Sequence, residues 1–275
     1  MLQRLLKLLL YRRPLRAELF RRLVQKFNLL TYPRRIEYSA VERPHYGYCL
    51  YHAAQLAKKL GHRCVSAIEF GVAGGKGLIN LEAHAAEVEM AVGIETELYG
   101  FDSGTGLPPP IDSRDLPYHW RGGFFAMNQE LLRSKLKRSK LVLGDVASTL
   151  TSFAETCHPA PIGALYMDLD YHSSTVSAMK LFDQHRSLLL PRVFIYFDDI
   201  IGSEIELFSE FSGERLAISE FNAAHAEQKI SPAFHLTAQP NAEKWHHQIY
   251  IYHDFQHPDY GKFISHADQQ RNLNA

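Results

Sequence analysis

The sequence predicts an α/β protein whose core is a doubly wound, mostly parallel sheet of seven strands. Three observations lead to this class. From residue 44 onward, short apolar runs alternate with segments of helical periodicity. The runs are apolar along their whole length, and most of them end in an acidic residue. Strands of this kind are buried on both faces, as they are when helices cover both sides of a parallel sheet.

The predicted elements alternate between helices and strands. The first helix of this part covers residues 47–60, and Gly61 ends it, since glycine is a common helix stop. The next strand covers residues 65–70, and the helix after it covers residues 77–89. Four further strands are predicted at 98–102, 140–145, 162–170 and 192–199, and four further helices at about 128–138, 146–156, 173–188 and 214–228.

The last two predicted strands differ from the others in how they are connected. They are FHLTAQ (234–239) and HQIYIYHDF (247–255), and between them we expect only a turn that contains Pro240 and Asn241. Two strands joined without a helix form an antiparallel hairpin. We therefore expect a C-terminal hairpin at one edge of the sheet.

The N-terminal part of the chain is basic and amphipathic. Residues 1–35 hold ten Arg and Lys but only one acid, Glu18, although the whole chain has a net charge of zero. Leucines at helical spacing predict helices on both sides of Pro14. We expect a basic helical extension at 1–43 and the main domain at 44–275. The apolar helix faces are expected to pack on the domain or to form a homodimer or higher homo-oligomer. Weak contact of residues 1–30 with a membrane surface is the alternative.

Cysteine usage and the first residues indicate a cytoplasmic location. Cys49, Cys64 and Cys157 are odd in number and show no C-x-x-C spacing, so neither a disulfide framework nor a zinc ribbon is expected. Lys7 interrupts the first apolar run, and no small-residue cleavage site follows it, which argues against a signal peptide. No stretch reaches the ~18 apolar residues of a membrane span.

Acidic residues stand at the carboxyl ends of five consecutive predicted strands, where open α/β sheets bind their ligands. A single acid after a strand is more often a helix cap, and Asp145 could be only that. Five in succession indicate a ligand site. These residues are Glu69, Asp102, Asp145, Asp168 with Asp170, and Asp198 with Asp199.

The first of these acids opens a glycine-rich loop between a strand and a helix. The loop reads EFGVAGGKG, which matches E-x-G-x-x-x-G at Glu69, Gly71 and Gly75. It is not the dinucleotide pattern, and Lys76 is followed by Gly77 rather than by the Ser or Thr of a P-loop. Together with Asp102 at the end of the second strand, this pattern is typical of class I S-adenosylmethionine-dependent methyltransferases.

Five motifs in order resemble the macrocin O-methyltransferase family. They are EFGVAGGKG, GFDSGTGLP (100–108), LVLGDVASTL (141–150), LYMDLDYHSST (165–175) and FIYFDDI (194–200). The resemblance implies a Rossmann-like methyltransferase fold, S-adenosylmethionine as cofactor, and a magnesium ion held by Asp168, with or without Asp170, and by Asp198 and Asp199. One departure stands out: the family usually reads D-L-D-L-Y, whereas here Tyr171 comes one residue early and His172 takes the tyrosine position.

The motifs and the residue chemistry together assign roles to the strand-end residues. Carboxylates suit Mg²⁺, and a metal bound to two vicinal oxygens lowers the pKa of an acceptor hydroxyl. The general base is expected among Asp168, Asp170 and His172. Asp102 is expected to bind the ribose hydroxyls and Asp145 to lie near the adenine amine. The predicted cofactor-binding residues are Glu69, Gly71, Gly75, Asp102, Ser103, Asp145 and Asp168.

We therefore predict a Mg²⁺-assisted, S-adenosylmethionine-dependent O-methyltransferase. Its acceptor is expected to be a hydroxyl of a small molecule, a sugar or a glycosylated metabolite. The long connection at 103–125 is expected to act as a lid or binding loop. No nucleic-acid partner is expected, because an excess of basic over acidic residues occurs only in the first 35 residues. The alternatives are a metal-independent small-molecule methyltransferase of the same fold and a non-catalytic nucleoside-binding module.

Overall fold

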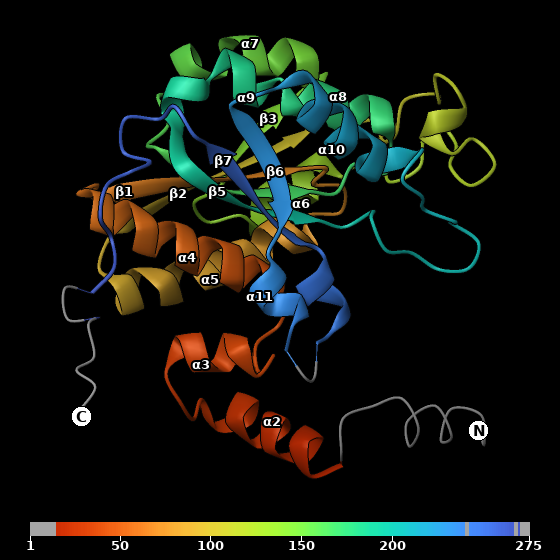
Figure 1. Cartoon of the computed structure of the whole chain (residues 1–275). Helices are drawn as coiled ribbons and strands as arrows, with labels where there is room; N and C mark the ends of the chain where they lie inside the picture. The colour runs from red at the N-terminus through yellow and green to blue at the C-terminus, as the bar shows by residue number, and fades with distance from the viewer. Residues whose placement is uncertain (1–14, 240–241, 267–268, 270–275) are drawn as a thin grey trace.

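The computed structural model describes residues 15–239, 242–266 and 269, and it contains a seven-stranded sheet (Figure 1). The strand order is β3-β2-β1-β4-β5-β7-β6. The first five strands along the chain are parallel, and β7 is antiparallel to both β5 and β6. The strands are β1 Cys64–Phe70, β2 Glu95–Asp102, β3 Lys140–Leu143, β4 Ile162–Met167, β5 Leu189–Phe197, β6 Gln228–Pro232 and β7 Ile249–Asp254. The predicted doubly wound fold is confirmed.

Helices cover both faces of the sheet (Figure 1). Helices α4 and α5 pack on one face, and α7, α8 and α10 on the other. The α-helices are α2 Leu15–Phe27, α3 Tyr32–Glu37, α4 Pro44–Leu60, α5 Lys76–Val92, α6 Gln129–Lys135, α7 Val146–Cys157, α8 His172–Met179, α9 Leu181–Gln184, α10 Gly213–Ala224 and α11 Phe234–Thr237. Short 3₁₀ turns are η1 Ser113–Asp115, η2 Arg186–Leu188 and η3 Lys244–His247.

The core consists of two apolar layers separated by the sheet. Successive residues of a strand point to opposite faces, so Ala67 of β1 belongs to the layer under α4 and α5, and Ile68 to the layer under α7, α8 and α10. Both side chains are fully buried. This burial on both faces is the reason why the strands read as continuous apolar runs.

Helix α4 begins at the carboxyl edge of the sheet. It runs antiparallel to β1, the strand that follows it, so its last residues lie near the start of β1 and its first residues near the end of that strand. The Tyr166 hydroxyl of β4 donates to the Tyr46 carbonyl in the first turn of α4, at 2.8 Å. The rings of Tyr46 and Tyr166 are stacked at 4.3 Å. The first residues of α4 therefore lie beside the ends of the central strands.

The predicted strand at 234–239 is wrong, because this segment contains α11. The outer strand that pairs with β7 is β6, which begins at Gln228, the last residue of the predicted helix, and ends at Pro232. The actual helix, α10, ends at Ala224, and the Asn222 side chain hydrogen-bonds both the N–H and the carbonyl of Ile230, at 2.8 Å each. Helical spacing directs Leu236 into the core while Phe234 is exposed. The antiparallel edge pair itself is confirmed, but α11 and η3 lie in its connection; Pro240 and Asn241 fall outside the described residues.

The helix predicted after Pro14 is present as α2, and α3 is an additional helix. The helix predicted before Pro14 lies outside the described residues. Val24 of α2 is buried, but four apolar side chains of this helix are between 42% and 61% exposed: Leu19, Phe20, Leu23 and Phe27. An ion pair between Arg35 and Glu87, at 2.6 Å, joins the segment after α2 to α5. None of the helices in the described ranges is long and apolar enough to cross a membrane.

Candidate active site

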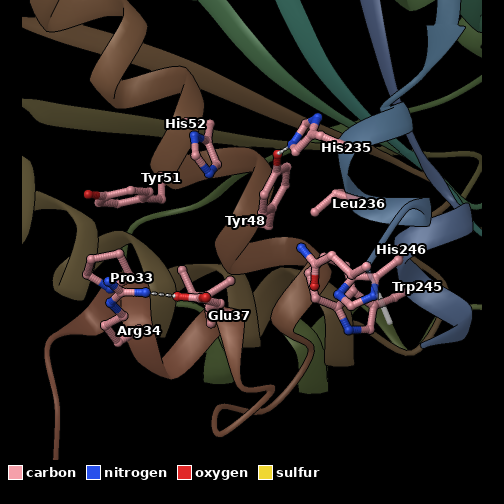
Figure 2. A pocket seen from close by; sticks show the side chains of 12 residues that line it. Pro33, Arg34, Glu37, Tyr48, Tyr51, His52, His235, Leu236, Trp245 and His246 are labelled. Atoms are coloured by element: carbon pink, nitrogen blue, oxygen red, sulfur yellow. Dashed lines mark hydrogen bonds and ion pairs between the residues drawn. The ribbon is translucent and has the colours of Figure 1, made fainter. Parts of the chain in front are cut away.

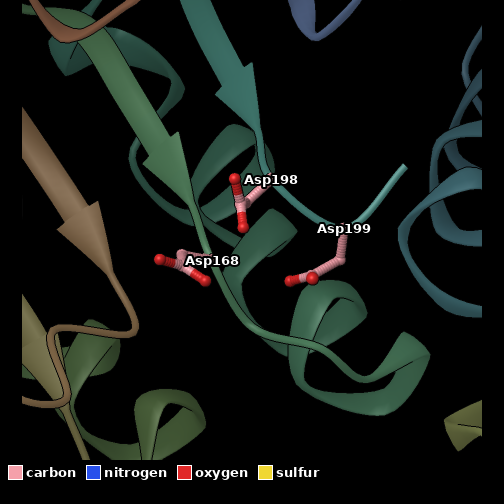
Figure 3. A group of neighbouring side chains, drawn as sticks. All are labelled: Asp168, Asp198 and Asp199. Carbon is pink, nitrogen blue, oxygen red and sulfur yellow. The ribbon is translucent and has the colours of Figure 1, made fainter. Parts of the chain in front are cut away.

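Three aspartates come together at the carboxyl edge of the sheet, where β4 and β5 end (Figure 3). Asp168 follows β4, and Asp198 and Asp199 follow β5. One carboxylate oxygen from each lies within 4.8 Å of the others. The backbone fixes this arrangement, because the N–H of Asp168 donates to the Phe70 carbonyl at 3.0 Å and the N–H of Asp198 to the Met167 carbonyl at 2.9 Å.

The electrostatics of this cluster favour a bound cation. Burial, together with repulsion from neighbouring carboxylates, raises the pKa of Asp168 and of Asp199 well above the ordinary range. Burial and the charge of Asp198 raise the pKa of Asp170 to about 7. The N–H of Asp170, a residue with a φ of +59°, donates to Oδ2 of Asp199 at 2.9 Å. Converging carboxylates are the donors that Mg²⁺ prefers, so the residues present fit this ion.

Glu214 is a further buried carboxylate of this cluster. It lies in the first turn of α10 and is fully buried. Its Oε2 accepts the N–H of Asp199 at 2.9 Å, and its Oε1 has no hydrogen-bond partner among the described residues. An acid at the start of a helix is ordinarily explained by the helix dipole, so the sequence held no signal for this position.

Glu69 lies at the end of β1 with an unpaired oxygen. Its Oε1 accepts the Tyr46 hydroxyl at 2.7 Å, whereas the buried Oε2 has no partner among the described residues. Burial raises the pKa of Glu69 to about 7, although the Tyr46 hydrogen bond opposes this shift. A carboxylate oxygen buried without a partner is costly, so a ligand donor at this position would stabilise it.

The glycines of the β1–α5 loop allow close packing around these acids. A Cβ on Gly71, whose φ is +87°, would lie 1.7 Å from the Asp168 carbonyl oxygen. A Cβ on Gly77 would lie 1.9 Å from Oε1 of Glu69. Gly75 precedes α5 with a φ of +79°, and a Cβ there would meet Leu132 at 2.1 Å. The bare backbone is thus required for the fold of the loop itself.

Asp102 connects the loops that follow β1 and β2. Its Oδ2 accepts the Ala73 N–H at 2.8 Å, and its Oδ1 accepts the Gly104 N–H at 2.6 Å. Each carboxylate oxygen keeps a further lone pair for a ligand. The neighbouring Ser103 hydroxyl donates to the Gly106 carbonyl at 2.8 Å and stabilises the turn.

Asp145 and His172 have protein partners of their own. Asp145 caps α7, since its Oδ1 accepts the Ser148 N–H at 3.1 Å, as the helix-cap interpretation predicts. Nε2 of the buried His172 lies 2.7 Å from Oε2 of Glu220 in α10. The structure thus brings Asp170 to the aspartate cluster and pairs His172 with an acid of another helix.

The start of α4 contributes two residues that the sequence analysis did not single out. Arg43 precedes the helix with a φ of +45°, and its charge opposes the rise that burial causes in the pKa of both Glu69 and Asp168. His45 stacks on Tyr196 with ring centroids 4.1 Å apart, and its buried Nε2 has no partner among the described residues. Burial, followed by the charge of Arg43, lowers the pKa of His45 to about 3. The sequence motifs at the strand ends do not include this segment, and its position beside them follows from the packing of α4.

The loops after β2 and β5 surround this edge of the sheet with apolar side chains. The loop at 103–128 contains η1, and its Tyr118 hydroxyl donates to the Glu206 carbonyl of the second loop at 2.7 Å. Asp115 binds the start of α8 through the N–H of Ser173, at 2.9 Å. Seven apolar side chains of the two loops are exposed: Ile111, Tyr118, Phe124, Phe125, Ile205, Leu207 and Phe211.

A separate cavity of about 300 Å³ lies between α3, α4, α11 and η3 (Figure 2). Aromatic rings and histidines line it, and the Tyr48 hydroxyl lies 2.7 Å from Nε2 of His235. No buried side-chain nitrogen or oxygen among its lining residues lacks a partner. His45, Glu69 and Glu214 at the strand ends do have unpartnered buried atoms, which makes the strand ends the better candidate for ligand binding.

Comparisons with known proteins agree with the fold. No protein-family model matches the sequence, and the curated proteins contain no match. Among solved structures, the calicheamicin methyltransferase CalS11 is similar with a TM-score of 0.50 and 22% identity, over 92% of this chain and 91% of that chain. An apo structure of CalS11, described as a TDP-rhamnose 3′-O-methyltransferase, gives 0.45 and 21% over 92% of both chains.

A third similar structure is MycE, a methyltransferase of mycinamycin biosynthesis in complex with Mg, SAH and mycinamycin VI. It gives a TM-score of 0.39 and 13% identity, over 74% of this chain and 48% of that chain. At 22% identity, the similarity to CalS11 with a TM-score of 0.50 is evidence about the fold alone. The chain has a Rossmann-like α/β fold, which it shares with the methyltransferase CalS11.

Proposed function

We propose that this protein is an S-adenosylmethionine-dependent O-methyltransferase that uses Mg²⁺, of the kind its motifs resemble in the macrocin O-methyltransferase family. One observation carries the proposal. Asp168, Asp198 and Asp199 converge within 4.8 Å, directly beside the glycine loop that ends β1. A nucleoside-binding module of similar fold has no use for such a cluster, and a nicotinamide dehydrogenase would carry the G-x-G-x-x-G pattern, which the loop after Glu69 does not have.

The cofactor is proposed to lie across the ends of β1, β2 and β4. Oε2 of Glu69 would accept hydrogen bonds from the ammonium group of the methionine part, with Gly71 and Gly75 in the adjoining loop. The remaining lone pairs of Asp102 would accept the ribose hydroxyls. Ser103 and Asp145 belong to the two following loops, on the ribose and adenine side. The support is the unpartnered Oε2 of Glu69 and the position of Asp102 between two loops.

The metal is proposed to be held by Asp168, Asp198 and Asp199. When bound, Mg²⁺ would lower the pKa of an acceptor hydroxyl and orient it for in-line attack on the methyl group. Asp168 or Asp170 would receive the hydroxyl proton, since both lie at the end of β4. His172 is the third candidate base, although its Nε2 is paired with Glu220. The Tyr196 hydroxyl donates to Oδ1 of Asp198 and holds that carboxylate in place.

The acceptor is proposed to be a small molecule with a hydroxyl group, a sugar or a glycosylated metabolite. The loops at 103–128 and 200–212 follow β2 and β5, so they flank the entrance to the strand ends. Their exposed apolar side chains, such as Phe124 and Phe211, offer contact area for an acceptor with an apolar portion.

The proposal extends to assembly as a homodimer. The exposed apolar side chains of α2 form a continuous helix face that burial would stabilise. A second copy of the chain is the proposed cover of this face, and weak contact with a membrane surface is the alternative.

Equilibrium dialysis tests the enzymatic part. We expect the protein to bind labelled S-adenosylmethionine, and metal analysis of the dialysed complex to find Mg²⁺ in a stoichiometric amount. Asp199→Asn removes a charge with little change in volume and should lower metal content. Asp183→Asn is the matched control, since Asp183 lies on α9 and pairs with His225. A protein that binds the cofactor but no metal in either form would support the metal-independent alternative.

A further inference from the structure

Glu214 is buried more deeply than an acid at the start of a helix needs to be. Its side chain is fully buried, and its Oε1 has no partner among the described residues. The next residue, Arg215, does not neutralise it: Arg215 Nε donates to the Ile200 carbonyl at 2.8 Å, and its guanidinium pairs with Glu210. An acid that only favours the helix dipole could remain in solvent, where its charge costs little.

Hydrogen bonds connect Glu214 to the aspartate cluster in a fixed order. Oε2 of Glu214 accepts the N–H of Asp199 at 2.9 Å, and Oδ2 of Asp199 accepts the N–H of Asp170 at 2.9 Å. Helix α10 is thereby joined to the end of β5, and the end of β5 to the end of β4. A shift of the Glu214 carboxylate would move the peptide of Asp199 and with it one of the proposed metal ligands.

The charge of Glu214 acts on the same aspartates that its hydrogen bonds position. Asp168, Asp170 and Asp198 each interact electrostatically with Glu214, and the charge of Glu214 in turn acts on Asp199. A fifth carboxylate in a buried group of like charges is unfavourable by itself, and a divalent cation removes that cost. The unpartnered Oε1 and the repulsion between the carboxylates both favour binding of a cation beside Glu214.

We propose that Glu214 is a positioning residue of the cation site. It orients Asp199 through the Asp199 N–H and adds a negative charge that strengthens binding of a divalent cation. This inference rests on the proposed function, because it requires that the three aspartates bind a metal ion. Residues behind metal ligands typically change metal affinity by about 10- to 100-fold when they are mutated.

Titration with Mn²⁺, followed by electron paramagnetic resonance of the free ion, tests the proposal. Glu214→Gln keeps an oxygen that can accept from Asp199 and removes the charge, so the Mn²⁺ dissociation constant should rise about tenfold or more. Glu214→Asp keeps the charge but shortens the side chain, and it should give a smaller loss. Glu210→Gln is the control, since Glu210 is an exposed acid close to the start of the same helix.

Thermal unfolding separates this role from a purely structural one. Without metal, Glu214→Gln should not lower Tm, because the amide oxygen can still accept the N–H of Asp199, whereas the rise in Tm caused by Mn²⁺ should shrink. Equal Mn²⁺ affinity in wild type and a folded Glu214→Gln variant would overturn the inference alone. A wild-type protein that binds no Mn²⁺ would contradict both the inference and the metal-dependent part of the proposed function.

Discussion

Tyr46→Phe tests whether the Glu69 carboxylate is held as the structure shows. The substitution removes one hydroxyl, which donates to Oε1 of Glu69 at 2.7 Å, and keeps the ring that stacks on Tyr166. Because Oε2 has no partner among the described residues, the variant leaves the buried carboxyl group without a side-chain donor. The loss of stability should therefore depend on whether Glu69 is charged.

The expected magnitude follows from the protonation state. Burial raises the pKa of Glu69 to about 7, so the group is neutral at about pH 5.5 and ionised at about pH 8.5. A hydrogen bond to a charged group contributes about 1.5–3 kcal/mol and a neutral one about 0.5–1.5 kcal/mol. Tyr46→Phe should therefore reduce the free energy of unfolding by about 1 kcal/mol more at the higher pH than at the lower. The sign follows because the lost hydroxyl stabilised the ionised form.

Urea unfolding at the two pH values measures this difference. Tyr166→Phe is the matched control, since its hydroxyl donates to the Tyr46 carbonyl, which does not titrate, at 2.8 Å. The control should lose about 0.5–1.5 kcal/mol at both pH values. A Tyr46→Phe variant whose loss is the same at both values would refute the reasoning about Glu69.

Three further predictions concern the cofactor, the acid cluster and the N-terminal extension. Asp102→Ala should weaken binding of S-adenosylhomocysteine by about 2 kcal/mol or more in calorimetry, and unchanged affinity would place the cofactor elsewhere. In the presence of chelator, the free energy of unfolding should fall as pH rises from about 5 to 8. The folded-state pKa values of Glu69 and Asp170 are both about 7, above the ordinary values of 4.5 and 3.8. The folded protein therefore binds more protons than the unfolded chain over this range, and it loses stability as those protons are released. Mg²⁺ should reduce this slope in a series of Tm measurements, and a slope that Mg²⁺ leaves unchanged would argue against the cation site. Deletion of residues 1–35 should convert the dimer to a monomer, as measured by light scattering. An unchanged number of subunits per particle, together with lost liposome binding, would favour the membrane alternative.

Most of the fold could be predicted from the sequence, because apolar runs alternate with segments of helical periodicity from residue 44 onward. The strand predicted at 234–239 is wrong because it was inferred from the local sequence pattern alone. FHLTAQ resembles a strand, but β7 is already paired on one side with β5 and on the other with residues 228–232. The segment after Pro232 therefore has no free strand edge beside β7, and it forms α11 instead.

The strand-end acids could be predicted as a group, because the carboxyl ends of parallel strands meet at one edge. Residues that reach this edge from helices could not be predicted in the same way. Glu214 reaches it from α10, and Arg43 and His45 reach it from the start of α4. Their proximity depends on the packing of whole helices, which no local spacing records.

The central claim is that Asp168, Asp198 and Asp199 hold a divalent cation beside the cofactor. The most direct test is a crystal grown with Mn²⁺ and S-adenosylhomocysteine, with anomalous diffraction recorded to locate the manganese. We expect one strong anomalous peak within about 2–2.5 Å of oxygens from all three carboxylates, with the cofactor across the ends of β1, β2 and β4. A bound cofactor with no anomalous peak between these three carboxylates would contradict it.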